Sequence, residues 1–598
     1  MTTVMSTATA LPRWDLTPAF AAPDSPELDA TMTSLRVRLV ELDGYLGDGP
    51  LDDDPVFVEQ VIGRWNDILR DVDLLANFLY AWNSADTTDA AAASKLSAFY
   101  EISADVDVTR SRVLSRLGSV DVDELVERSE TARAHEHFLR TTAIEAAHQM
   151  PLAEEELAAK LRPGAGASWE RLREDVASRL STRFELDGEE RDRPISEIMN
   201  LSSHPDRDVR RRAYEAEGRL WAEAAVPIAA SLNGIKNEAI VLSDRRGWAD
   251  PLDVALHQNA IDRQVLDAMV AAMETVYEPL RGHLRRKARM MGVERLAWYD
   301  LASPLGDDRT VYTFDEARAL LLDTVAELSP RLEAMLRRAF DERWIDAEPR
   351  SGKYGGAYCC EIFPHGSRIL MNFDGSLSAV STLAHELGHA FHDLCLADRT
   401  PLQRPLPMTL AETASMLLQH MLEDVLLERA PDAGKLTILN SRLNDAASML
   451  FDLRSRFEFE RALFEARRER AVTVEELDEM TLEAQARAYG DALDPALRAP
   501  FRWAARSHYY SVDLGYYNFP YQFGLLFGLG LYKRYLADPA GFAAPYERLL
   551  SRTGMASAVD LARDFAIDLH DQAFWSSSLD VIREDIARFA ELTPEAEG

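Results

Sequence analysis

The chain has 598 residues, of which 47% are hydrophobic and 28% charged, so it can bury several cores and has the composition of a globular protein. Its net charge of −34 argues against nucleic acid as a partner, because such binding depends on neutralising phosphates. It has only three cysteines, too few for a disulfide framework, and no apolar run of the roughly 18 residues that a membrane helix needs.

The start of the chain, MTTVMSTATALPRWDLTPAF, contains no basic segment followed by an apolar stretch, which is the pattern of a signal peptide. The scarcity of cysteine is compatible with a reducing compartment. We therefore expect a cytoplasmic protein that neither enters a membrane nor binds nucleic acid.

Residues 1–200 are predicted to form a helical domain, separate from a second domain over residues 201–598. Apolar residues recur at helical spacing in SPELDATMTSLRVRLVELDGYL, which opens with a Ser-Pro-Glu helix start. The same pattern continues over residues 53–86, Ser94–Leu117 and Asp121–Ala147. The sequence has no repeat of fixed period, which argues against a solenoid.

The only persuasive strand signals lie in the segment before the histidine-rich helix described next. GGAYCCEIF runs to a turn at Pro364–Gly366, and SRILMNF then runs to a turn at Asp374–Gly375. These segments predict a small antiparallel sheet, whose edge can pair with an extended peptide backbone. Gly356, Ala357 and Tyr358 are the candidate substrate-binding residues here. The alternative is a hairpin with a purely structural role.

The segment STLAHELGHAFHDLCL, Ser381–Leu396, is predicted to form a packed helix that carries a metal site. His385 and His389 are one turn apart, about 6 Å along the axis, so both imidazoles can reach one ion. His-Glu-x-x-His on a helix is a zinc-hydrolase signature, with Glu386 as the general base. His392 lies about 10 Å from His385 along the axis, too far to join the same ion easily.

The third ligand is predicted further along the chain. A glycine three residues after the second histidine would allow a further histidine ligand, but that position is His392, so this solution fails. Glu412 lies in TLAETASMLLQHMLEDVLLER, a predicted helix that can return antiparallel to the first. Thr409 and Glu412 also fit a capping box, which is the structural alternative. His392 is then expected to support a ligand or to pack in the core, donating to a carboxylate or carbonyl.

A third constellation is RWAARSHYYSVDLGYYNFPYQFG, Arg502–Gly524, which contains five tyrosines and one histidine. Such an aromatic cluster is often simply core. A zinc peptidase, however, needs a donor for the oxyanion of its tetrahedral intermediate, and Tyr or His can supply one.

With these motifs in place, the chain resembles the oligoendopeptidase F branch of the thimet oligopeptidase family. The resemblance rests on TLAHELGHAFH, AETAS, GGAYC, HYYSVDLGYYNFPYQFG and the opening WDLTPAF. It implies a mainly α fold, a multi-helix ellipsoid divided by a deep substrate channel, with a small antiparallel β-sheet beside the metal helix. It also implies a zinc metallopeptidase catalytic domain over residues 201–598, and an N-terminal domain like that of the family from about residue 115.

The resemblance also implies the roles of the site residues. One zinc ion per chain, in a gluzincin-type site, is expected to be held by His385, His389 and Glu412, with Glu386 as the base. His508 and a following tyrosine are expected to bind the tetrahedral intermediate. Judged by distance from His508, Tyr517 fits best, and Tyr516 and Tyr521 compete with it. Tyr521 is also a candidate substrate-binding residue.

We therefore expect an endopeptidase that cleaves internal bonds of short unfolded oligopeptides. One alternative is a metallocarboxypeptidase on a similar helical scaffold, which would need a fixed cation for the chain terminus. The other is a non-catalytic peptide-binding protein, which would have no need of Glu386.

Overall fold

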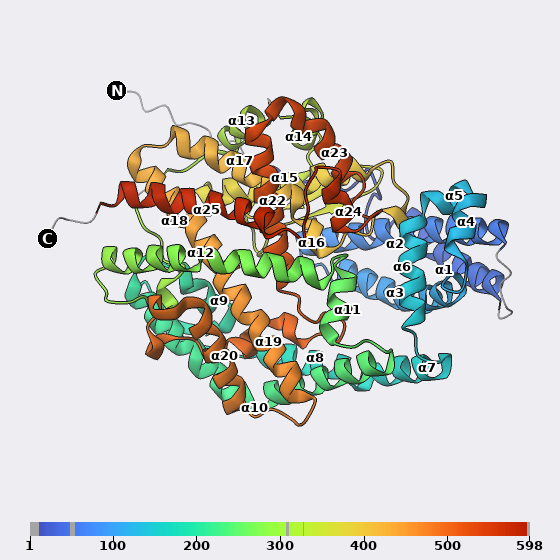
Figure 1. The fold of residues 1–598 in the computed structure, drawn as a ribbon, viewed down its shortest axis with the longest axis horizontal. Helices are drawn as coiled ribbons and strands as arrows, with labels where there is room; N and C mark the ends of the chain where they lie inside the picture. The colour runs from blue at the N-terminus through green and yellow to red at the C-terminus, as the bar shows by residue number, and fades with distance from the viewer. Residues whose placement is uncertain (1–10, 48–53, 307–309, 327, 595–598) are drawn as a thin grey trace. The chain divides into compact units, whose positions relative to one another are not determined.

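The computed structural model describes residues 11–47, 54–306, 310–326 and 328–594, and it is mainly helical (Figure 1). This confirms that the fold is mainly α with small β-sheets, whereas the deep substrate channel stays a prediction. The structure divides into two compact units, each assembled from three stretches of chain. The first unit comprises Met1–Ala147, Arg309–Val425 and Arg534–Ile567, and the second comprises His148–Asp308, Leu426–Lys533 and Asp568–Gly598. The domain boundary expected at residue 200 stays a prediction.

The expectation that no signal peptide is present depends on residues 1–10, which lie outside the described residues. Within the described part of the chain, every helix is too short or too polar to cross a membrane.

The first unit contains most of the N-terminal helices and the metal helix. Its helices are α1 (Pro26–Leu46), α2 (Pro55–Ala85), α3 (Ala90–Leu117), α4 (Val122–Arg128), α5 (Glu130–Ala134), α6 (Glu136–Ala147), α13 (Phe314–Val325), α14 (Pro330–Asp341), α15 (Leu377–Leu396), η4 (Pro401–Gln403), α16 (Met408–Ala411), α17 (Thr413–Arg429, which ends in the second unit), α23 (Pro539–Leu550) and α24 (Ala558–Arg563).

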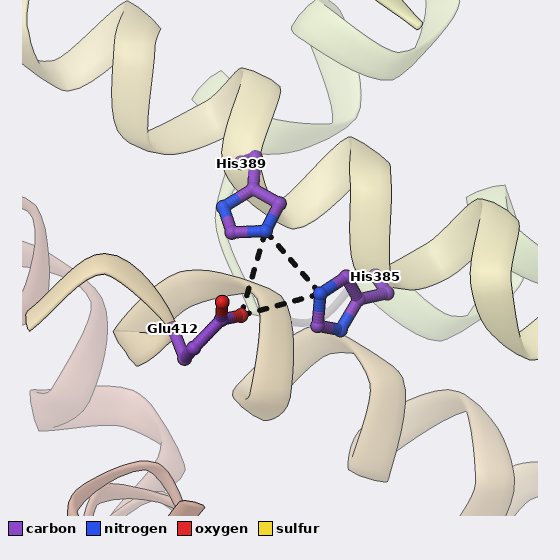
Figure 2. A group of neighbouring side chains, drawn as sticks. All are labelled: His385, His389 and Glu412. Carbon is purple, nitrogen blue, oxygen red and sulfur yellow. Dashed lines mark hydrogen bonds and ion pairs between the residues drawn. The ribbon is translucent and has the colours of Figure 1, made fainter. Parts of the chain in front are cut away.

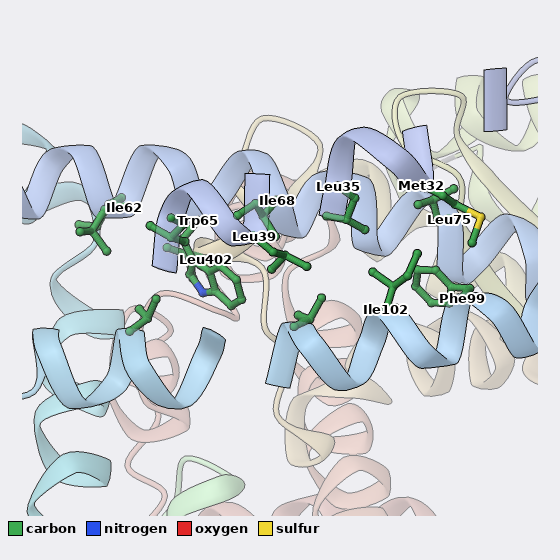
Figure 3. Packing of buried hydrophobic residues seen from close by; sticks show 14 of the residues in the cluster. Met32, Leu35, Leu39, Ile62, Trp65, Ile68, Leu75, Phe99, Ile102 and Leu402 are labelled. Carbon is green, nitrogen blue, oxygen red and sulfur yellow. The ribbon is translucent and has the colours of Figure 1, made fainter. Parts of the chain in front are cut away.

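The N-terminal helices begin where the sequence places their caps. The side chain of Ser25 accepts a hydrogen bond from the backbone N–H of Leu28, and Pro26 follows at the first helical position. The apolar stripes of α1, α2 and α3 then meet in one core, to which Leu39, Trp65 and Ile102 contribute one side chain each (Figure 3).

This core also supports the sheet of the first unit. Ile362, which directly follows β4 (Tyr358–Glu361), and Leu370 of β5 (Ser367–Leu370) belong to the same buried cluster as the N-terminal helices. The cluster therefore fixes one face of the sheet that lies beside the metal helix.

The helix predicted over Asp121–Ala147 is wrong as a single element, because the structure breaks it into α4, α5 and α6. Ser129 adopts an extended conformation, and its hydroxyl accepts a hydrogen bond from the N–H of Ala132, so a new helix starts there. Each short helix still buries part of the apolar pattern: Val122 and Leu125 in α4, Ala132 in α5 and Leu139 in α6.

The predicted antiparallel pairing before the metal helix is confirmed. In β4 and β5, Tyr358 pairs with Leu370 and Glu361 pairs with Ser367. The sheet also contains a strand that sequence analysis missed, β3 (Ile345–Asp346), which pairs parallel to β5 and is only two residues long. The strand order is β3-β5-β4, so β4 is an edge strand.

The expectation that strand signals occur only before the metal helix is wrong, because the second unit contains a hairpin. Its strands are β1 (Ser181–Leu186) and β2 (Glu189–Pro194), joined by Asp187 and Gly188. Both turn residues have positive φ, 55° and 79°, as a two-residue hairpin turn requires.

The remaining helices belong to the second unit. They are η1 (Arg162–Gly164), η2 (Leu201–Ser203), η3 (Trp298–Asp300), η5 (Ser448–Asp452), η6 (Gly490–Ala492), η7 (Pro495–Leu497), η8 (Ser507–Tyr510), α7 (Leu152–Leu161), α8 (Gly166–Ser178), α9 (Ile195–Asn200), α10 (Arg207–Arg245), α11 (Pro251–Gln258), α12 (Arg263–Met290), α18 (Asp432–Ala447), α19 (Leu453–Arg467), α20 (Val474–Tyr489), α21 (Arg502–Ala505), α22 (Phe519–Ala537, which ends in the first unit) and α25 (Gln572–Leu592). One of its cores includes Trp221, Leu232, Leu463, Trp503 and Tyr509.

Candidate metal centre

Three side chains of the first unit converge on one point (Figure 2). His385 and His389 come from α15, and Glu412 comes from the junction between α16 and α17. The Nε2 atoms of the two histidines are 3.2 Å apart. The Oε2 atom of Glu412 lies 3.2 Å from Nε2 of His385 and 3.5 Å from Nε2 of His389.

This triangle has the dimensions of a zinc site. With zinc–ligand bonds of about 2.0–2.1 Å, a tetrahedral arrangement separates neighbouring ligand atoms by about 3.3 Å. The three measured separations, 3.2, 3.2 and 3.5 Å, are close to that value. Two histidines and a glutamate are also one of the ligand sets of catalytic zinc, in which the fourth position serves water or substrate. The residues present therefore fit zinc.

The position of Glu412 depends on a close approach of two helices. A Cβ atom at Gly388 would lie 2.5 Å from Cα of Ser415 and 2.6 Å from the carbonyl oxygen of Ala414, so only glycine allows the start of α17 to lie this near α15. Ser415 in turn donates a hydrogen bond of 2.7 Å to Oε2 of Glu412.

The predicted helix around Glu412 is interrupted at that residue. Glu412 ends the short α16 with φ −87° and ψ 6°, and α17 starts at Thr413. The N-cap of α16 is Pro407, which makes no side-chain cap, and the carboxylate of Glu412 faces the two imidazoles. The capping-box alternative is therefore wrong.

The charges of His389 and Glu412 suit metal binding at neutral pH. Burial lowers the pKa of His389 to about 4, so its imidazole is neutral and can ligate. Burial opposes ionisation of Glu412, but the two imidazoles and Ser415 hold the pKa of its carboxyl at about 2. Burial likewise opposes protonation of His385, yet the adjacent Glu412 raises the pKa of His385.

Glu386 lies next to His385 on α15 and is buried, with 6% of its surface exposed. Burial raises the pKa of Glu386 to about 7, with His385 lowering it and Glu412 raising it further. A carboxyl whose pKa is near neutrality can accept a proton and return it within one reaction cycle. The residue therefore has the environment of a general base.

His392 does not join the three converging side chains. It is 1% exposed, and its Nε2 atom is 2.9 Å from the hydroxyl of Thr553, which itself donates to the carbonyl of Leu550. Burial lowers the pKa of His392 to about 3. The expectation of a core histidine is confirmed, and its surroundings are the hydroxyl of Thr553 and the backbone of Leu550.

The candidate substrate-binding residues Gly356 and Ala357 lie just before β4, and Tyr358 is its first residue. The Tyr358 hydroxyl bonds to that of Ser84, and its ring contacts Tyr80 at 5.1 Å. Its side chain is thus directed toward the N-terminal helices, while the strand itself packs against α15.

In the second unit, the structure brings together three of the four predicted aromatic residues. The ring centroids of His508 and Tyr517 are 5.9 Å apart, and the Tyr521 hydroxyl donates to that of Tyr517 at 3.1 Å. Tyr516, by contrast, is 2% exposed, has a positive φ of 56° and stacks on Phe464. It belongs to the core, which leaves Tyr517 and Tyr521 as the candidates.

His508 is neutral at physiological pH. Burial lowers its pKa to about 4, and the nearby cations Arg456 and Lys236 act in the same direction. Its Nε2 atom makes no hydrogen bond to any residue that the structure describes. A neutral imidazole still has one N–H group to donate.

Sequence analysis missed the polar side chains that lie behind the metal ligands, Ser415, Gln419 and Glu423 on α17 and Ser381 on α15. A signal was present, because polar residues occur at positions 415, 419 and 423, every three to four residues after Glu412.

Comparison with known proteins identifies a family of peptidases, in agreement with the metal site. The model of peptidase family M3 matches residues 200–581, and that described as oligopeptidase F matches residues 114–181. The group B oligopeptidase PepB of Streptococcus agalactiae is 24% identical over 522 residues, covering 86% of this chain and 85% of its own. An oligoendopeptidase F homolog of Lactococcus lactis is 21% identical over 97% of both chains.

Solved structures share the fold. The crystal structure of oligoendopeptidase-F from Enterococcus faecium superposes with a TM-score of 0.71 at 18% identity, covering 96% of this chain and 99% of that one. At this level of identity the likeness concerns the fold alone.

Proposed function

The chain belongs to peptidase family M3, in its oligopeptidase F branch of zinc metallopeptidases, and from that premise we propose that it is an endopeptidase of short unfolded oligopeptides. The observation that carries the proposal is the triangle of ligand atoms from His385, His389 and Glu412, with the buried carboxyl of Glu386 beside it. These residues would hold one zinc ion per chain.

When bound, zinc supplies a Lewis acid that polarises a carbonyl and lowers the pKa of water. Glu386 accepts the proton that the attacking water loses and passes it to the leaving amine. Its pKa of about 7, raised by burial, supports both steps, because neither the protonated nor the ionised form is strongly favoured near neutral pH.

His508 and Tyr517 are proposed to donate hydrogen bonds to the oxyanion of the tetrahedral intermediate. The neutral state of His508 and its unbonded Nε2 among the described residues support this role. Tyr521 donates to the oxygen of Tyr517, which leaves the proton of Tyr517 available for the substrate. Such a donor contributes roughly 3–4 kcal/mol in comparable enzymes.

The edge of β4 that does not pair with β5 is proposed to pair with the backbone of the substrate. Three observations support this: β4 is an edge strand, it packs against α15, and Gly356 and Ala357 extend it toward its N-terminal end. Backbone pairing gives affinity without demanding particular side chains, as an enzyme for diverse peptides requires. Tyr521 is proposed as a further contact to the substrate.

The proposal is tested with a peptide blocked at both ends. We expect internal cleavage that depends on zinc, detected by mass spectrometry of the products. Removal of single residues from an unblocked C-terminus, with the blocked peptide intact, would instead indicate a metallocarboxypeptidase. Binding of both peptides without cleavage would indicate a peptide-binding protein. A cytoplasmic location stays a prediction, which cell fractionation tests.

A further inference from the structure

Two polar stripes face each other across the contact between α15 and α17. On α15, Ser381 and His385 are four residues apart, one helical turn. On α17, Gln419 and Glu423 have the same spacing. These four side chains form a polar strip between the two helices, in the first unit.

The strip is a continuous chain of hydrogen bonds that ends at a metal ligand. Nδ1 of His385 lies 3.0 Å from Oε1 of Gln419. Nε2 of Gln419 donates to Oε1 of Glu423 at 2.9 Å. The hydroxyl of Ser381 bonds to the same carboxylate oxygen. Glu423 is buried, with 7% of its surface exposed, so the far end of the chain is fixed.

The direction of every bond follows from the chemistry of Glu423. An ionised carboxylate can only accept hydrogen bonds, so Gln419 must turn its NH₂ group toward Glu423. The amide oxygen of Gln419 must then face His385, and only an N–H at Nδ1 can satisfy it. The proton of a neutral His385 is therefore on Nδ1, and the lone pair is on Nε2, the atom that faces Glu412 and His389.

We infer that Gln419 and Glu423 are positioning residues that set the tautomer of His385 and hold its Nε2 in the orientation for metal binding. The inference rests on the zinc site of the proposed function. A histidine ligand generally donates its other ring N–H to an acceptor, and loss of that acceptor typically weakens metal binding about 10–100-fold. Here the acceptor is an amide, and the carboxylate that orients it lies one helical turn further on.

The alternative is that the strip only pairs the two helices and has no effect on the metal. The two explanations differ in what a swap of the two side chains does. In the double variant Gln419→Glu with Glu423→Gln, a carboxylate accepts directly from Nδ1 of His385, and an amide behind it donates to that carboxylate. The acceptor for His385 is preserved although the natural pair is replaced at both positions.

The experiment measures zinc affinity of the full chain by competition with a chelator, together with thermal unfolding of the metal-free protein. Gln419→Met keeps the length of the side chain but removes the acceptor, and we expect it to weaken zinc binding about 10–100-fold. In Glu423→Gln alone, the side-chain amide of Gln419 can rotate by half a turn because the acceptor that fixes it is gone. We therefore expect a smaller loss of zinc affinity than in Gln419→Met. The double variant should return to within a few-fold of the original affinity.

The exposed Glu428→Gln, on the same helix, is the matched control for loss of one negative charge and should leave zinc affinity unchanged. Unchanged zinc affinity in Gln419→Met would overturn the inference. A double variant that binds zinc no better than Gln419→Met would also overturn it, because the strip would then only pair the two helices without affecting the metal. If the unmodified chain binds no zinc, the zinc site of the proposed function is wrong. That outcome differs from a chain that binds zinc equally well with and without Gln419, in which only the positioning role is wrong.

Discussion

Gly388 of α15 and Ser415 of α17 touch backbone to backbone, so closely that a methyl group on Gly388 would lie 2.5 Å from Cα of Ser415. Gly388 directly precedes the ligand His389, and Ser415 donates to the ligand oxygen of Glu412. One contact therefore fixes the distance between the part of the site that comes from α15 and the part that comes from α17.

Replacing Gly388 with alanine tests this contact. Because the added Cβ meets backbone atoms and not a flexible side chain, the two helices must separate, and we expect a loss of about 1–3 kcal/mol in the free energy of unfolding. Zinc affinity should fall in the same variant. Gly63→Ala on α2 is the control, because nothing lies within 4 Å of its Cβ position, and it should stabilise the protein by about 0.5–1 kcal/mol.

The ligand set is tested by metal content. We expect about one zinc per chain, removed by chelators together with activity, and loss of zinc in Glu412→Ala because only two ligands remain. His392→Ala should keep its zinc but unfold at a lower temperature, since it leaves a cavity and removes the bond to Thr553. Elemental analysis of purified variants decides this, and full zinc content in Glu412→Ala would contradict the assignment.

The aromatic residues of the second unit are separated by conservative substitutions. Tyr517→Phe should lower kcat roughly 10²–10³-fold with little change in KM, as expected for a donor that acts only in the transition state. Tyr516→Phe should retain most activity, because that ring packs in the core. Steady-state kinetics with one peptide compares the three tyrosine variants. Normal kcat in Tyr517→Phe, together with loss of activity in Tyr521→Phe, would instead identify Tyr521, one helical turn further along, as the donor.

The stability of the protein should depend on the protonation of His283. This residue packs edge-on against Phe589 at 4.6 Å, and neither ring nitrogen has a hydrogen-bond partner among the described residues. Burial, with the nearby Lys287 and Arg286, lowers the pKa of His283 from 6.5 to about 3. Between these values the unfolded chain binds a proton that the folded chain does not, so the free energy of unfolding falls as the pH falls.

For this one histidine the loss amounts to about 2 kcal/mol between pH 7 and pH 5. Urea unfolding of His283→Phe at both pH values checks the effect. We expect the variant to gain stability relative to the unmodified protein as the pH is lowered. If the free energies of unfolding of the two proteins differ by the same amount at both pH values, His283 does not contribute to the pH dependence of stability.

The metal helix could be predicted from sequence because its information is local. The spacing of His385 and His389 places both imidazoles on one face of any helix, and an apolar stripe shows that the helix is packed. Glu412 was predictable only through the assumption that the chain returns antiparallel to that helix. Gln419 could not be assigned a partner, because which residue of α17 faces His385 depends on the register of the two helices.

The misses in the fold have equally specific causes. The β1–β2 hairpin has an Asp-Gly turn that predicts a hairpin, but its second strand, EERDRP, is charged and lacks apolar alternation. The two residues of β3 are too few to form a sequence pattern. The break at Ser129 depends on a side-chain cap within a stretch whose hydrophobic spacing stays helical.

The central claim, that this chain cleaves peptides with Glu386 as the base, is tested most directly by Glu386→Gln. The amide has nearly the same shape but cannot accept the proton of water, so we expect full zinc content, intact peptide binding and turnover reduced roughly 10²–10⁴-fold. The measurement is the rate of cleavage of a doubly blocked, internally quenched peptide by protein of verified zinc content. Turnover within about tenfold of the unmodified enzyme would contradict the account.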